Sequence, residues 1–125
     1  MKHLLSLFLF LACAHGFAQN ADCERFHTGK FRYDNPDYGL IVVKRSKDTQ
    51  VEITEQGKIE IHSSIKWLNE CKYILTYQKI VNADVPELIG DKMTVEILEN
   101  QGNKYTCRVT SQEGFTTIVE VVKID

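Results

Sequence analysis

The sequence predicts an all-β protein, a single eight-stranded antiparallel meander that closes into a small up-and-down barrel. Apolar and polar side chains alternate with a period of two along several segments, which is typical of strands with one buried face. Segments rich in β-branched and aromatic residues are separated by short stretches of Gly, Asn, Asp, Ser and Pro. Because such short connections join antiparallel neighbours, and closure removes exposed edges, a closed meander is expected.

The expected strands follow one another with one longer connection. The clearest alternation is "KIEIHSSIKW" at 58–67, and "KYTCRVT" at 104–110 repeats it. The connection "NADVPELIG" at 82–90 has room for a single helical turn. The eight expected strands cover residues 29–33, 38–45, 51–54, 58–67, 72–81, 92–98, 104–110 and 115–124.

An immunoglobulin-like β-sandwich is the alternative fold. The stretch "YTCRV" at 105–109 looks like the Tyr-x-Cys end of such a domain, with Trp67 as its core tryptophan. The partner cysteine of that pattern should lie near Ile53, whereas Cys23 is 44 residues before Trp67. The cysteine spacing therefore favours the barrel.

Residues 1–18 have the pattern of a cleaved secretory signal peptide. A basic start at Lys2 precedes a short apolar run, and small residues precede a cut near Ala18. We therefore expect a single β-barrel domain over residues 19–125 that is secreted or periplasmic. The apolar run is too short to span a bilayer, so no membrane insertion is expected. Lipoprotein anchoring at Cys13 is disfavoured, because the residues before it fit an aliphatic-small-small pattern poorly.

Charge and motifs exclude several classes of function. Without residues 1–18 the net charge is about −3, spread along the chain with no basic face. We therefore expect no nucleic-acid partner. The sequence also has no Gly-rich phosphate loop and no nucleophile elbow, and we expect no cofactor.

Three cysteines remain after residue 18, and we expect one disulfide between Cys23 and Cys71. Cys107 shares its parity with Tyr105 and Val109, which points its side chain toward the core as a small hydrophobe. In a meander the first and fifth strands start at the same end, so Cys23 can reach Cys71 across the barrel floor. The N-terminal segment would then plug that end. Cysteines spaced so widely do not form a zinc site.

The polar residues do not predict an enzyme. His62 lies on the wet face of its strand, and His27 fits a turn or capping role before the first strand. The alternation turns Glu52, Glu60 and Glu96 toward water, which leaves no inward acid and base pair. We therefore expect neither catalysis nor a metal site.

A ligand-binding role depends on how full the barrel is. Six inward rings favour a mostly filled interior, because an eight-stranded barrel has little more room than its side chains need. These rings belong to Phe31, Tyr33, Trp67, Tyr73, Tyr77 and Tyr105. Buried tyrosine hydroxyls need partners, however, and a small apolar or amphipathic ligand in the barrel mouth could supply them.

The candidate ligand-binding residues lie on the inward parity or at the open end. They are Tyr33, Tyr38, Tyr73, Tyr77 and Leu88. The open end is expected to be framed by Asp34, Asn35, Tyr38, Val85, Leu88 and Ile89. The alternative is a packed structural or interaction domain that binds a protein or glycan through its outer face, and an immunity-type inhibitor is a third hypothesis.

Two resemblances accompany these patterns. In "FHTGKFRY", Gly29 and Phe31 are similar to the Gly-x-Trp/Phe first strand of lipocalin-like barrels. Nearly the whole chain after residue 18 resembles short, uncharacterised secreted bacterial proteins with Cys-x-x-Phe-x-x-Gly-x-Phe followed by Trp-x-x-x-Cys-x-Tyr. Some members of that group carry a topoisomerase label, but about 107 residues with no basic face lack the parts for DNA strand passage.

Overall fold

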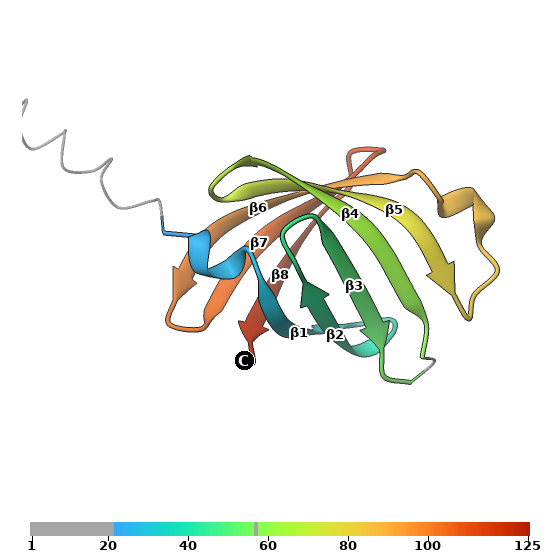
Figure 1. The fold of residues 1–125 in the computed structure, drawn as a ribbon, viewed down its shortest axis with the longest axis horizontal. Coiled ribbons are helices and arrows are strands. Elements are labelled where there is room, and N and C mark those ends of the chain that lie inside the picture. Colours follow the sequence, from blue (N-terminus) through green and yellow to red (C-terminus); the bar gives the residue numbers. More distant parts are fainter. Residues whose placement is uncertain (1–21, 57) are drawn as a thin grey trace, which may run out of the picture.

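The structure is a computed structural model, and it describes residues 22–56 and 58–125. Eight antiparallel strands form a closed barrel in sequence order (Figure 1). The strands are β1 Gly29–Asn35, β2 Gly39–Arg45, β3 Thr49–Thr54, β4 Glu60–Asn69, β5 Lys72–Val81, β6 Lys92–Gln101, β7 Lys104–Ser111 and β8 Thr116–Lys123. The predicted all-β meander is confirmed, and a sandwich is not needed. The predicted signal peptide and Cys13 lie outside the described residues.

Two short 3-10 turns complete the described fold. The turn η3 (Pro86–Leu88) lies in the long connection between β5 and β6, where one helical turn was expected. The turn η2 (Glu24–Phe26) precedes β1 and was not expected. We call the end of the barrel at η2 the floor, and the opposite end, where η3 lies, the mouth.

The floor is closed by the N-terminal segment, as predicted. Cys23 and Cys71 form a disulfide, which ties η2 to the connection between β4 and β5. The side chain of Phe26 is fully buried, and Figure 1 shows η2 beside one end of the barrel. Lys123 Nζ donates to the carbonyl oxygen of Arg25 at 2.7 Å, which fixes the last strand to the same segment. The other cysteine of the predicted set, Cys107, is free and buried.

The turn between β4 and β5 differs from the expected one at residues 68–70. Asn69 still pairs with Lys72, after a register shift that follows Trp67. The side-chain oxygen of Asn69 accepts the backbone N–H of Cys71 at 2.9 Å. This local hydrogen bond closes the turn one residue later than the sequence pattern suggested.

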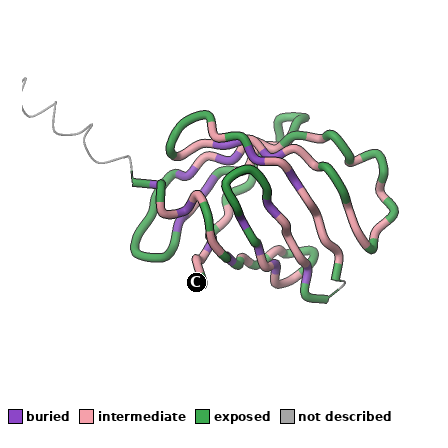
Figure 2. Tube along the Cα trace, in the orientation of Figure 1, coloured by how far each residue is buried: buried purple, intermediate pink, exposed green. Residues whose placement is uncertain are grey.

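Buried residues are concentrated in the floor half of the barrel, and buried positions alternate along the strands with less buried ones (Figure 2). The rings of Phe26 and Tyr105 are 4.9 Å apart, and those of Trp67 and Tyr73 are 4.5 Å apart. Phe31 packs edge-on against Tyr105 at 6.1 Å. These five rings therefore pack near the floor, and the mouth half of the interior is less filled.

The strands also separate toward the mouth. β1 pairs with β8 only through Phe31 with Lys123 and Arg32 with Val122. β5 pairs with β6 only from Lys72 to Thr76, after which the connection carrying η3 departs. Fewer strand pairs at this end give a barrel that is tight at its floor and wide at its mouth.

Candidate functional site

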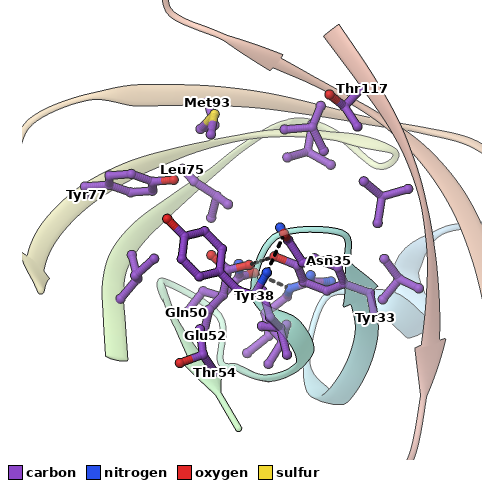
Figure 3. Close-up of a pocket in the computed structure, with 18 of the residues that line it drawn as sticks. Tyr33, Asn35, Tyr38, Gln50, Glu52, Thr54, Leu75, Tyr77, Met93 and Thr117 are labelled. Atoms are coloured by element: carbon purple, nitrogen blue, oxygen red, sulfur yellow. Dashed lines mark hydrogen bonds between the residues drawn. The ribbon is translucent and has the colours of Figure 1, made fainter. Parts of the chain in front are cut away.

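The barrel encloses a cavity of about 440 Å³ that extends toward the mouth (Figure 3). This volume falls within the range of small-molecule sites, roughly 300–1,000 Å³. The expectation of a mostly filled interior was therefore wrong, because four of the six counted rings, those of Phe31, Trp67, Tyr73 and Tyr105, gather near the floor. The aliphatic side chains that line the cavity are Ile41, Val43, Ile59, Ile61, Leu75, Ile80, Ala83, Val85, Leu88, Val95, Val109, Val119 and Val121.

All five residues predicted to bind a ligand line this cavity, namely Tyr33, Tyr38, Tyr73, Tyr77 and Leu88. Tyr73 is buried near the floor, whereas Tyr38 lies at the mouth and is 54% exposed. Figure 3 shows Tyr33 and Tyr77 on separate strands around the same space. The sequence therefore located the cavity wall correctly, although ligand binding there stays a prediction.

The predicted frame of the mouth is correct only in part. Asn35 and Val85 line the cavity, but Asp34 and Ile89 do not. Asp34 has the opposite parity to Tyr33 on β1 and its side chain is exposed. Ile89 follows η3 and is 45% exposed, so it faces solvent beside the opening.

A buried arginine at the base of the cavity was missed by sequence reasoning. Arg45 is 6% exposed, and its guanidinium lies 4.3 Å from the centre of the Phe31 ring. It donates hydrogen bonds to Gln50 Oε1 (2.8 Å), the Phe26 carbonyl (2.8 Å), the Tyr73 hydroxyl (3.1 Å) and the Tyr105 hydroxyl (3.0 Å). These four bonds compensate the buried guanidinium charge for its lost contact with water. The bond to Phe26 also joins β2 to the N-terminal segment that closes the floor.

Arg45 escaped notice because the apolar run in "GLIVVKR" hides which parity of β2 faces inward. The inward residues are Ile41, Val43 and Arg45, so the arginine ends an otherwise aliphatic series. The signal in the sequence that could have revealed Arg45 is that it shares the parity of the inward residues Ile41 and Val43. Because arginine side chains are mostly exposed, Arg45 was not expected to face the interior.

Strand β3 faces the other way from our expectation. Gln50, Glu52 and Thr54 line the cavity, whereas Val51 and Ile53 have the outward parity. The expectation that Glu52 faces water was therefore wrong. Alternation identifies residues that share a face but does not say which face is inside.

Polar partners explain why β3 turns its hydrophilic face inward. Gln50 accepts from Arg45, and Glu52 Oε1 accepts the hydroxyl proton of Tyr33 at 2.6 Å. Thr54 Oγ1 accepts the backbone N–H of Ile59 at 3.0 Å. Buried polar groups are tolerated when they are hydrogen-bonded in this way. The other two carboxylates behave as expected, since Glu60 and Glu96 remain partly exposed.

The buried environment shifts the protonation of the cavity groups. Burial raises the pKa of Glu52, and the Tyr33 hydrogen bond and the Arg45 charge oppose that rise. Burial and the neighbouring Glu52 raise the pKa of Tyr33, and the pKa of Tyr77 rises to about 12. Burial raises the pKa of the Cys107 thiol to about 11. The cavity thus favours the uncharged forms of Glu52, Tyr33, Tyr77 and Cys107.

Neither histidine of the described chain lines the cavity. The His27 ring stacks on Trp67 with 3.6 Å between ring centres, and its Nε2 lies 2.7 Å from the Glu70 carbonyl. His62 Nε2 lies 2.9 Å from Glu60 Oε1. Over residues 22–56 and 58–125, no cluster of three His, Cys, Asp or Glu side chains could hold a metal ion. No helix within the same residues is long and apolar enough to cross a membrane.

Comparison of the chain with protein-family models, with curated proteins and with solved structures gave no match.

Proposed function

We propose that this chain is a secreted, non-enzymatic β-barrel that binds a small apolar or amphipathic ligand in its interior. The observation that carries the proposal is the cavity of about 440 Å³, which has mainly aliphatic walls and a few convergent polar groups. Secretion is supported by the signal-peptide pattern of residues 1–18 and by the Cys23–Cys71 disulfide, which is typical of an oxidising compartment.

The rigid floor supports binding to a preformed site. The disulfide and the four hydrogen bonds of Arg45 fix the base of the cavity before any ligand arrives. A preformed site avoids the entropy cost of ordering side chains on binding. The mouth half has fewer strand pairs, and it is the end through which a ligand would enter.

The position of the titratable side chains supports binding without catalysis. His27 and His62 both lie outside the cavity lining, so neither can act as a base on a molecule held there. Glu52 is the one carboxyl among the described lining residues, and it is engaged by Tyr33. A second candidate function, binding a protein through the outer surface, is favoured by Phe115 and Ile118, which are 76% and 57% exposed.

Two adjacent positions on β8 provide a matched test. Val119 lines the cavity, whereas Ile118 is exposed. Calorimetric titration with decanol should show binding to the wild type and to Ile118→Phe. Binding should be about tenfold weaker or lost for Val119→Phe, which places a bulkier side chain inside the cavity. Equal binding to both variants, or no binding to the wild type, would contradict the proposal.

A further inference from the structure

The charges that line the cavity limit the ligand it can accept. Among the described lining residues, Arg45 carries a positive charge and Glu52 is the one side chain with a carboxyl group that can carry a negative charge. Arginine stays protonated in proteins, whereas a carboxyl group can take up a proton. With the tyrosine hydroxyls protonated, the lining charge is therefore either zero or +1 and never negative.

The hydroxyl groups near Arg45 offer hydrogen-bond donors. Nη2 of Arg45 donates to both Tyr73 and Tyr105, so each of these hydroxyl oxygens acts as an acceptor and keeps its own proton to donate. One of these protons can serve the neighbouring hydroxyl, because the two tyrosines interact directly. The second proton then needs another acceptor, and both side chains line the cavity.

Three acceptors near this cluster already take one hydrogen bond each. Gln50 Oε1 and the Phe26 carbonyl accept from Arg45, and Glu52 Oε1 accepts from Tyr33. The base of the cavity thus combines a fixed positive charge with two tyrosine hydroxyls that can donate to a ligand. A group with acceptor oxygens and negative charge complements this arrangement, whereas an ammonium group would meet Arg45 with the same sign.

We propose that the base of the cavity, formed by Arg45, Tyr73 and Tyr105, is a subsite for the carboxylate head group of an amphipathic ligand. The apolar chain of that ligand would run toward the mouth along the aliphatic wall that includes Leu75 and Val95. This inference rests on the proposed ligand-binding function and specifies its chemistry. The subsite is complete when Glu52 is protonated, because only then is the lining charge +1.

Proton uptake therefore accompanies binding of the carboxylate. The groups facing Glu52 are Tyr33 from β1, Arg45 from β2 and Tyr77 from β5. The net charge of the cavity lining changes only when Glu52 gains or loses a proton, because Arg45 stays protonated and the tyrosines stay neutral. Affinity for a carboxylate should therefore fall as pH rises, by up to about tenfold for each pH unit above the pKa of Glu52.

The test uses three probes with the same chain, decanoate, decanol and decylamine, titrated calorimetrically into the disulfide-bonded protein from about pH 6 to about pH 9. We expect decanoate to bind about tenfold more tightly than decylamine at the lower pH, and its affinity to decline at higher pH. Glu52→Gln should keep decanoate affinity high and constant across the range, because the lining charge is then fixed at +1. The control Glu120→Gln, on the exposed face of β8, should keep the decline of the wild type.

Different failures separate the two proposals. Decanol binding without preference for decanoate, or tighter binding of decylamine, would overturn the carboxylate subsite and leave the ligand-binding function standing. A pH dependence that persists in Glu52→Gln would also overturn the subsite. Failure of all three probes to bind the wild type would remove both proposals.

Discussion

The Tyr33 hydroxyl donates to the Glu52 carboxyl at 2.6 Å inside the barrel, joining the first and third strands across the cavity wall. This bond places an acid in an apolar interior, close to the buried charge of Arg45. It explains why β3 turns its polar residues inward, since the carboxyl finds there both a donor and a positive field. The same bond makes the protonation of Glu52 a property that experiments can follow.

Glu52→Gln should change the pH dependence of stability. The pKa of Glu52 is raised in the folded state, so its favourable contribution is present below the ordinary value of about 4.3 and is lost as pH rises through the folded pKa. The free energy of unfolding of Glu52→Gln should therefore increase relative to the wild type as pH rises, and urea titrations from about pH 4 to about pH 9 would measure this. A constant difference between the two proteins would show that Glu52 is not perturbed.

Removal of the disulfide should destabilise the floor. Cys23→Ser with Cys71→Ser opens a loop that spans a sequence separation of 48 residues. The chain-entropy estimate gives a loss of about 4 kcal/mol in the free energy of unfolding. Denaturant titration of the double variant and of the oxidised wild type would measure the difference. A loss below about 1 kcal/mol would indicate that η2 stays in place without the covalent link.

Arg45→Met should destabilise the barrel although it replaces a buried charge with an apolar side chain. The Phe26 carbonyl and the hydroxyls of Tyr73 and Tyr105 would each lose a donor, and we expect a cost of about 3 kcal/mol in chemical denaturation. Lys44→Met is the matched control, because Lys44 precedes Arg45 on the exposed parity. That control should stay within about 0.5 kcal/mol of the wild type. Equal effects of the two variants would contradict the structural role of Arg45.

Cys107 should react slowly with thiol reagents in the native protein. Its side chain is buried, and its pKa of about 11 leaves little thiolate at neutral pH. Labelling with iodoacetamide should therefore be much slower in buffer than in denaturant, which mass spectrometry would follow over time. Similar rates in the two conditions would show that the floor half of the barrel opens readily.

The fold was predictable because alternation, turn residues and short connections all agree on a meander. The Cys23–Cys71 pairing was also predictable, since strand order alone brings the two positions to one end. The hollow interior was not, because the number of inward rings does not reveal that Phe26, Trp67 and Tyr105 gather at the floor. Glu52 was assigned to the wrong face for a related reason, since its partners Tyr33 and Arg45 come from other strands.

Native mass spectrometry of the protein purified from its own periplasm or medium tests the central claim most directly. If the cavity is a ligand site, part of the sample should carry a small molecule that is released on denaturation, and Val119→Phe should carry less of it than Ile118→Phe. Repeated recovery of the polypeptide mass alone, from both variants and from the wild type, would contradict the account and favour a domain that acts through its outer surface.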